Sequence, residues 1–294
     1  MDDQQWLAER FEQHRSHLRA VAYRMLGSLT EADDAVQEVW LRLTRTDTSL
    51  VENLGAWLTT IIARVSLNML RSRQGRLAEP LGPHFPEPII DPADGTDPEH
   101  EALLADAVGL ALLVVLQTLN PSERLAYVLH DMFDMPFDEI APIVERSPQA
   151  ARQLASRARR RVRSAAPPHD SDLTGQRAVV DAFLAASRDG DFDALISVLH
   201  PDVVLRADRS AGPASASVEV RGATTVAGRA LTYMRLGLLD KPALINGTPG
   251  AIYSRHGQPF SVIGFTVTAG RITEIDILAD PDRLKQLDLS GLDD

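Results

Sequence analysis

The chain has 294 residues, of which 44% are hydrophobic and 24% charged, and its formal net charge is −11. A chain of this length usually forms two or three domains of about 100 to 150 residues each, and the composition excludes a wholly disordered or collagen-like protein. The absence of cysteine excludes disulfides, thiolate zinc centres and cysteine nucleophiles. A reducing compartment fits this composition.

Neither a membrane span nor a secretion signal is evident. The longest apolar run, Val108–Leu116, includes Gly109 and is about half of the roughly 18 residues that a span requires. The first residues, Met1–Gln5, are acidic and polar, which is not typical of a signal peptide. We therefore expect a cytoplasmic protein that does not contact a membrane.

Two breaks divide the chain. Six of its 18 prolines fall between Pro80 and Pro98, which predicts a linker. A second break, rich in proline, serine and aspartate, lies between residues 164 and 175. The expected organisation is a domain over 1–78, a proline-rich linker over 79–106, a domain over 107–165, a linker over 166–173 and a domain over 174–294.

The first segment has apolar residues at three- and four-residue spacing, which predicts amphipathic helices. Thr30, followed by acidic residues, has the pattern of a helix start. A third apolar helix begins near Trp57, and its far end is rich in arginine. We predict an all-helical bundle with one basic end.

The second segment predicts a helix-turn-helix. After an apolar helix over 108–119, Asn120 can cap a helix that begins at Pro121. A short helix over 137–144 is followed by Ser147 and Pro148, which suit the start of a helix that runs to about residue 162.

The predicted second helix of this motif is strongly basic. Residues 146–163 contain seven arginines and no acid, although the chain as a whole is acidic. Such a cluster is typical of a phosphate-binding surface. The alternative is an ordinary helical hairpin with a solvated arginine face.

The third segment changes from helical to strand periodicity. Two helices, one around residues 178–184 and one over 192–199, precede alternating runs that are typical of strands. The expected strands are 203–207, 217–220, 251–254, 260–267 and 272–278. Helices followed by an antiparallel sheet predict a separate α+β domain.

Three motifs occur together in order along the first 165 residues. They are Asp33–Trp40, the stretch from Ala56 to Ser72, and the stretch from Leu119 to Arg160. With these motifs the chain resembles an extracytoplasmic-function (ECF) sigma factor, and its C-terminal segment is similar to the SnoaL-like (NTF2-like) family. The resemblance implies two all-α sigma domains, the second a helix-turn-helix, and a cone-shaped α+β C-terminal domain.

The resemblance implies that the chain binds core RNA polymerase and promoter DNA, and that it is not an enzyme. The residues that match the polymerase-docking helix are Asp34, Gln37, Glu38 and Leu41. Without the resemblance, these residues would read as an ordinary solvated helix face. No cofactor, metal ion or zinc-containing anti-sigma factor is implied.

Promoter DNA has two elements for such a protein to contact. For opening and recognition of the minus-ten element, the expected residues are Arg64, Asn68, Arg71, Ser72, Arg73 and Arg76. For the minus-thirty-five element, a recognition helix would present Gln149, Arg152, Gln153, Ser156, Arg157 and Arg160. Arg159, Arg160 and Arg163 are expected to contact the phosphate backbone.

Two short motifs resemble those of sigma factors that carry this C-terminal domain, a subgroup that includes the mycobacterial J-type and I-type proteins. One is a linker motif, in which Phe85 stands where the subgroup has Trp-Leu, and the other a tail motif, in which Asp280 replaces Asn. The residues concerned are Pro86, Glu87 and Pro88 in the linker and Asp280, Pro281, Asp282, Arg283 and Leu284 in the tail. We expect these motifs to meet and to regulate the DNA-binding domains in cis.

The C-terminal domain leaves alternatives open. Relatives of this fold include isomerases and cyclases, for which His200, Asp202, Asp208 and Tyr233 would be the candidates. A turn with a capping aspartate explains His200–Asp202 equally well. A module that binds a small-molecule ligand or contacts protein is favoured over catalysis. The alternative for the whole chain is a helix-turn-helix regulator fused to a small-molecule-binding or enzymatic domain.

Overall fold

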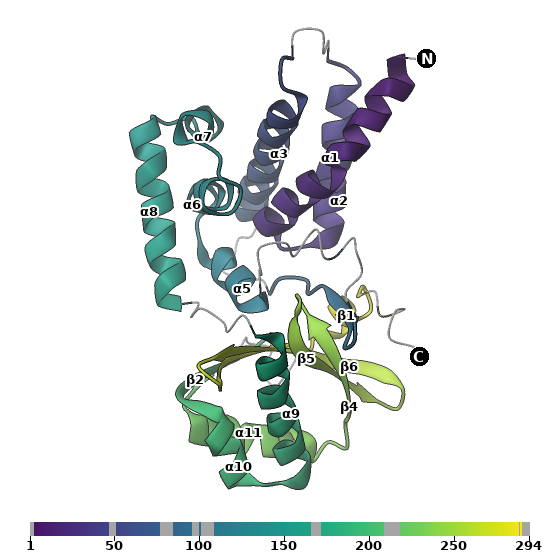
Figure 1. Cartoon of the computed structure of the whole chain (residues 1–294), viewed down its shortest axis with the longest axis vertical. Coiled ribbons are helices and arrows are strands. Elements are labelled where there is room, and N and C mark those ends of the chain that lie inside the picture. The colour runs from purple at the N-terminus through teal and green to yellow at the C-terminus, as the bar shows by residue number, and fades with distance from the viewer. Residues whose placement is uncertain are drawn as a thin grey trace. The chain divides into compact units, whose positions relative to one another are not determined.

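The computed structural model describes residues 3–46, 51–76, 85–95, 100, 109–165, 172–208, 218–287 and 289. The chain forms two compact units (Figure 1). The first comprises Met1–Leu81, Pro98–Asp106 and Val115–Ala165, and the second comprises Gly82–Asp97, Ala107–Val114 and Ala166–Asp294. Among the described residues, no helix combines the length and the hydropathy needed to cross a membrane.

The first unit begins with the helices α1 (Asp3–Leu26), α2 (Leu29–Leu43) and α3 (Leu54–Arg76). Their apolar residues are buried against one another, as the spacing predicts. The expected start of the second helix at Thr30 is wrong by two residues. Ser28 has extended backbone and its hydroxyl accepts a hydrogen bond from the Glu31 amide, so that Thr30 lies inside the first turn.

The basic segment of this unit contains α6 (Pro121–Tyr127), α7 (Phe137–Val144) and α8 (Pro148–Ala165), preceded by α5 (Leu110–Thr118). Both predicted caps are confirmed: the Asn120 side chain accepts from the Glu123 amide, and the Ser147 hydroxyl accepts from the Ala150 amide. A π-helical turn, η2 (Val128–Met132), follows α6 and was not expected from the sequence.

The second unit joins three helices to a sheet. The helices are α9 (Leu173–Asp189), α10 (Phe192–Val198) and α11 (Ala223–Met234). The strands are β1 (Ile90–Pro92), β2 (Leu199–Ala207), β3 (Val218–Arg221), β4 (Leu239–Ile245), β5 (Thr248–Arg255), β6 (Gln258–Thr268) and β7 (Arg271–Leu278). A short helix, α12 (Pro281–Leu284), follows the last strand.

The sheet has the order β1-β4-β5-β6-β7-β2-β3. The expectation of a purely antiparallel sheet is wrong, because β2 pairs with β7 in parallel. The chain can make this pairing because α11 and the strands β4 to β6 intervene between the two strands. A tight turn at Ala269–Gly270 joins β6 and β7: both residues have positive φ, and the two strands form an antiparallel pair around it.

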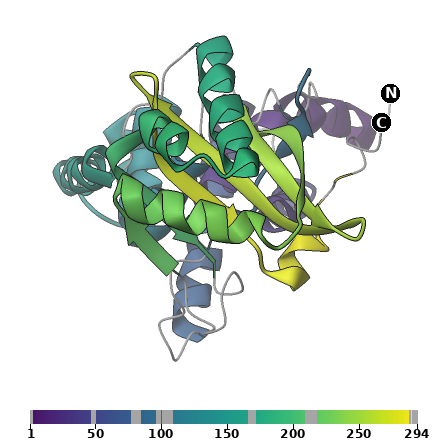
Figure 2. The ribbon, with the colours of Figure 1, turned by 90° about the horizontal axis from the view of Figure 1, so that it is seen from below.

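The two faces of the sheet have different cores. Figure 2 shows α9, α10 and α11 lying across one face, where Phe183, Tyr253 and Phe265 are buried. On the opposite face, Ile245 and Val262 pack with Phe85 and Leu110 from the segment that precedes the recognition helices. Helices packed on one face of this sheet make the unit an α+β domain, the fold class expected for it.

Candidate nucleic-acid interface

The basic helix α8 is amphipathic. It buries Ala151, Ala155, Ala158 and Val162, each at most 8% exposed, against the rest of the first unit. Every residue that was predicted to contact the minus-thirty-five element is exposed, namely Gln149, Arg152, Gln153, Ser156, Arg157 and Arg160. The structure therefore gathers these side chains on the solvent side of one helix, as a groove-reading helix requires.

The turn before α8 has the geometry of a helix-turn-helix. Helix α7 ends at Glu145, whose φ of 57° is left-handed. The backbone then extends so that the Ser147 hydroxyl caps α8. Because a left-handed residue at the end of a helix reverses the chain sharply, α7 and α8 are brought into contact.

Three of the arginines on α8 are held by carboxylates. Arg157 Nε donates to Glu123 Oε1 at 2.9 Å, and Arg161 lies 3.5 Å from the other oxygen of Glu123. Arg159 Nε donates to Asp131 Oδ1 at 2.7 Å, and this hydrogen bond raises the pKa of Arg159. These pairs fix α8 on α6 and on the π-helical turn, a role that the sequence did not predict.

Other arginines of α8 keep their charge available. Arg160 and Arg163 are exposed and carry no ion pair within the part of the chain that is described. Arg152 is exposed as well, and its guanidinium lies over the Phe137 ring, 5.6 Å from the centroid. These three residues can offer N–H groups to phosphates or base edges without breaking an existing ion pair.

The C-terminal half of α3 carries the residues predicted for the minus-ten element. Arg64, Asn68, Arg71 and Ser72 are exposed. Arg73 is half-buried and forms an ion pair with Glu31 of α2. Arg76 lies at the end of the helix, and its side chain is outside the described residues.

A cleft of about 550 Å³ connects α3 with α2. Asn68, Ser72 and Arg73 line one wall. Asp34 and Glu38, from the predicted polymerase-docking face, belong to the other. The predicted DNA-contacting and polymerase-docking residues therefore meet at one place.

The rest of the predicted docking face lies on α2. Asp34 and Gln37 are exposed, and Glu38 accepts a hydrogen bond from Arg42 at 2.8 Å. Leu41 is 40% exposed, which is notable for a leucine on a helix with a fully buried apolar stripe. Exposed leucine flanked by polar groups is a composition that suits docking against another protein.

Two buried arginines connect the helical segments of the first unit. Arg124 of α6 is 3% exposed, and its Nη1 donates to the Met25 carbonyl at 2.7 Å, at the C-terminal end of α1. Burial, aided by the charge of Arg73, lowers the pKa of Arg124 to about 9. Arg24 of α1 is 1% exposed and stacks on Phe133, with 4.6 Å to the ring centroid. These contacts join residues about a hundred positions apart, so no local sequence pattern predicts them.

The linker and tail motifs meet in the second unit. Arg283 of α12 donates to the Phe85 carbonyl, and burial lowers the pKa of Arg283, opposed by the charges of Asp208, Asp280 and Glu87. Pro86 and Pro88 are buried. Of the tail residues Asp280, Pro281, Asp282 and Leu284, Asp280 caps α12 and Leu284 packs in the same cluster as Phe85.

Further contacts hold the linker on the sheet. β1 pairs with β4 in antiparallel register, and the Asn246 side chain accepts from the Ile89 amide at 3.3 Å. Arg177 of α9 donates to the Ala93 carbonyl. Residues 209–212, which together with Asp208 loosely match a Gly-rich motif of the same subgroup, lie outside the described residues.

The side chains of three candidates for catalysis, Asp208, Tyr233 and His200, have other hydrogen-bond partners. Asp208 accepts from the amides of Ala279 and Asp280 at 3.0 Å, and Tyr233 donates to the Ser261 hydroxyl at 2.7 Å. His200 Nδ1 accepts from the Asp202 amide within the irregular start of β2, so these residues begin a strand and do not form the capping turn that was the alternative to a catalytic role. Within the described ranges, His, Asp and Glu side chains form no group of three that could hold a metal ion.

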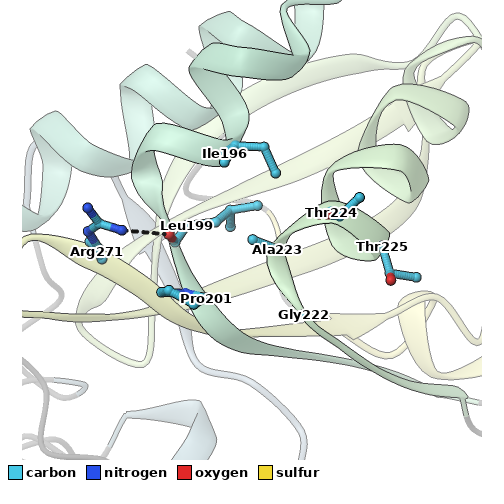
Figure 3. A pocket seen from close by; sticks show the side chains of 8 residues that line it. All are labelled: Ile196, Leu199, Pro201, Gly222, Ala223, Thr224, Thr225 and Arg271. Atoms are coloured by element: carbon cyan, nitrogen blue, oxygen red, sulfur yellow. Dashed lines mark hydrogen bonds between the residues drawn. The ribbon is translucent and has the colours of Figure 1, made fainter.

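A pocket of about 420 Å³ lies elsewhere in the domain (Figure 3). Its walls come from α10, the start of β2, the start of α11 and Arg271 of β7. Arg271 donates to the Leu199 carbonyl at 3.5 Å. None of the four catalytic candidates lines this pocket.

Comparisons with known proteins agree over both units. The chain matches the family Sigma-70 region 2 over residues 10–76 and the family Sigma-70, region 4 over residues 109–162. It is 39% identical to the ECF RNA polymerase sigma factor SigJ of Mycobacterium tuberculosis over 273 residues, covering 91% of this chain and 86% of that protein. It is 31% identical to the probable ECF sigma factor SigI of the same species, covering 93% of each.

A solved structure is similar along nearly the whole length. The crystal structure of M. tuberculosis SigJ superposes with a TM-score of 0.78 at 34% identity, covering 96% of this chain and 99% of that one. The similarity thus includes the C-terminal α+β domain as well as the helical segments.

Proposed function

Since this chain belongs to the extracytoplasmic-function RNA polymerase sigma factors, we propose a division of its work among its domains. A sigma factor binds core RNA polymerase and directs it to promoters, and this family membership makes the chain a transcription factor and not an enzyme. We assign polymerase docking and the minus-ten element to residues 1–78, the minus-thirty-five element to 107–165, and regulation to 174–294. We place the protein in the cytoplasm, with the polymerase.

The exposed face of α8 is the observation that supports our assignment of the minus-thirty-five element to residues 107–165. Arg152 lies in the N-terminal turns of α8, where a recognition helix reaches base edges. Arg163 lies in its last turn, where a side chain reaches backbone phosphate. Arg157 and Arg159 contribute to this surface mainly by holding the helix, because their guanidinium groups already bind Glu123 and Asp131.

The cleft between α2 and α3 supports the roles proposed for the first domain. Asn68 and Ser72 offer groups that can hydrogen-bond an unstacked base, and exposed Arg64 and Arg71 can neutralise phosphates nearby. Asp34, Gln37, Glu38 and Leu41 would contact the polymerase on the adjacent helix. A protein that opens DNA while bound to polymerase needs both contacts in one domain.

Regulation in cis is supported by the linker. Between Phe85 and Ala93, the chain that connects the two DNA-binding domains is held by Arg283, Asn246 and Arg177 of the C-terminal unit. A linker bound in this way has less freedom to adjust the spacing of the two DNA-binding domains. The pocket of Figure 3 is our candidate place for a small-molecule ligand of this domain.

The experiment compares Arg152→Ala with Arg163→Ala in full-length protein bound to core polymerase. Arg152→Ala should weaken binding to a selected promoter by roughly 5- to 150-fold, with little effect on random duplex, because a bidentate base contact is lost. Arg163→Ala should weaken both duplexes alike and lower the slope of log affinity against log salt by about one. Equal effects of Arg152→Ala on both duplexes would contradict the assignment.

A further inference from the structure

The guanidinium group of Arg152 lies over an aromatic ring, that of Phe137. Its guanidinium carbon is 5.6 Å from the centroid of Phe137, the first residue of α7. This separation is within the roughly 6 Å over which a cation is attracted to a ring face. Arg157 and Arg159, in contrast, donate hydrogen bonds to the carboxylates of Glu123 and Asp131.

Phe137 also contacts a second ring, that of His130. The His130 ring lies 3.9 Å from the Phe137 ring, centroid to centroid, with 35° between the planes. His130 Nδ1 is 3.1 Å from the Met135 carbonyl oxygen, which fixes the imidazole. His130 belongs to the π-helical turn η2, and such turns are found frequently at functional sites.

We infer that Phe137 and His130 are positioning residues that hold Arg152 in place to read a base of the minus-thirty-five element. A free arginine side chain has many rotamers, and it loses part of this freedom on binding. Attraction to the ring face restricts the guanidinium in advance, and its N–H groups stay available for a bidentate contact with guanine. The inference rests on the proposed function of Arg152.

The consequence is a loss of selectivity at one base when the ring is removed. A contact of this kind at an exposed site corresponds to roughly a two- to fivefold effect. Phe137→Leu keeps an apolar side chain at this half-buried position but removes the ring face. Phe137→Tyr keeps the ring face and should retain the selectivity.

The test uses full-length protein bound to core polymerase. The probe is a promoter duplex with a fixed minus-ten element and a randomised minus-thirty-five element, and bound molecules are sequenced. The variants are Arg152→Ala, Phe137→Leu, Phe137→Tyr and the double variant Phe137→Leu/Arg152→Ala. The matched control is Phe133→Leu, because Phe133 contacts His17 and Arg24 of α1. Thermal unfolding confirms that each variant is folded.

Arg152→Ala identifies the base position that this residue reads. At that position, Phe137→Leu should lower discrimination two- to fivefold, and Phe137→Tyr and Phe133→Leu should not. The double variant should discriminate no less than Arg152→Ala alone. The inference is wrong, while Arg152 keeps its role, if Phe137→Leu leaves the base preference at that position intact. It is also wrong if Phe137→Leu lowers discrimination among bases equally at all positions. If Arg152→Ala changes no preference, the proposed role of Arg152 fails and the inference fails with it.

Discussion

The role of each arginine on α8 depends on what holds its guanidinium. The sequence shows seven arginines between residues 146 and 163, and from their number it predicts a phosphate-binding helix. It does not show that Glu123 and Asp131 neutralise three of them, because these acids lie on α6 and η2. Which arginines have guanidinium groups held by carboxylates depends on tertiary contacts, and the structure separates Arg152 and Arg163 from Arg157 and Arg159.

A second charged cluster, in the C-terminal unit, leads to a prediction about pH. Arg206 of β2 donates to Glu274 at 2.8 Å and lies 3.4 Å from Asp276, and both carboxylates are nearly fully buried on β7. Burial, opposed by Arg206 and aided by the charge of Glu274, raises the pKa of Asp276 to about 7. One guanidinium group therefore pairs with two buried carboxylates. Because of its raised pKa, Asp276 is protonated in the folded state at moderately acidic pH.

Stability should consequently fall as the pH rises from about 4 to about 7. In this range the unfolded chain has released the Asp276 proton, since its ordinary pKa is 3.8, while the folded chain still holds it. The effect is on the order of a few kcal/mol and levels off above the folded pKa. Unfolding of the full chain, measured from pH 4 to 8, should show the decline. Asp276→Asn should remove much of it, and an identical pH dependence in the variant would contradict this account.

At the scale of elements, Glu123 holds α8 against α6. It is 6% exposed and receives Arg157 at 2.9 Å, and Arg161 lies 3.5 Å from it. Glu123→Gln keeps the shape and removes the charge, which weakens both contacts inside a buried site. We expect the free energy of unfolding to fall by about 1 to 2 kcal/mol. The loss is no larger because both arginines are half exposed, and solvent screens their charges.

Urea unfolding of the full chain measures this loss. The matched control is Glu139→Gln, because Glu139 is an exposed acid on α7. The control should change stability by less than about 0.5 kcal/mol. Equal stability of Glu123→Gln and the parent protein would show that the ion pairs do not hold the helix.

Elements with strong local signals could be predicted from the sequence. Asn120 and Ser147 have the side chains that cap helices, and α7 begins and ends at the expected residues. β4 and β1 were not expected, because Pro242 and Pro92 interrupt the strand pattern, and β1 is an edge strand where proline is tolerated. Helix α11 was missed as well, since its sequence includes Thr224, Thr225 and Gly228, which are weak helix formers.

At the scale of the molecule, the sequence motifs predict the sigma domains but not the placement of the linker. Phe85 and Ile90 belong to the core of the C-terminal unit, although they lie between the two DNA-binding segments in the chain, and Leu110, from the start of the second segment, packs in the same core. A proline-rich composition does not indicate which residues of a linker are buried in the core of a neighbouring domain. The contact between Arg283 and Phe85 brings together positions 198 residues apart, and only the resemblance of the two motifs suggested it.

Run-off transcription with purified bacterial core polymerase tests the central claim most directly, on promoter DNA that the holoenzyme has selected from a library. The full chain should start transcription at the selected promoter. Arg283→Ala, which breaks the contact with Phe85, should change the yield by roughly fivefold or more, whereas the exposed Lys285→Ala should not. No initiation by any form, together with tight binding to palindromic duplex without polymerase, would contradict the account and favour a helix-turn-helix regulator.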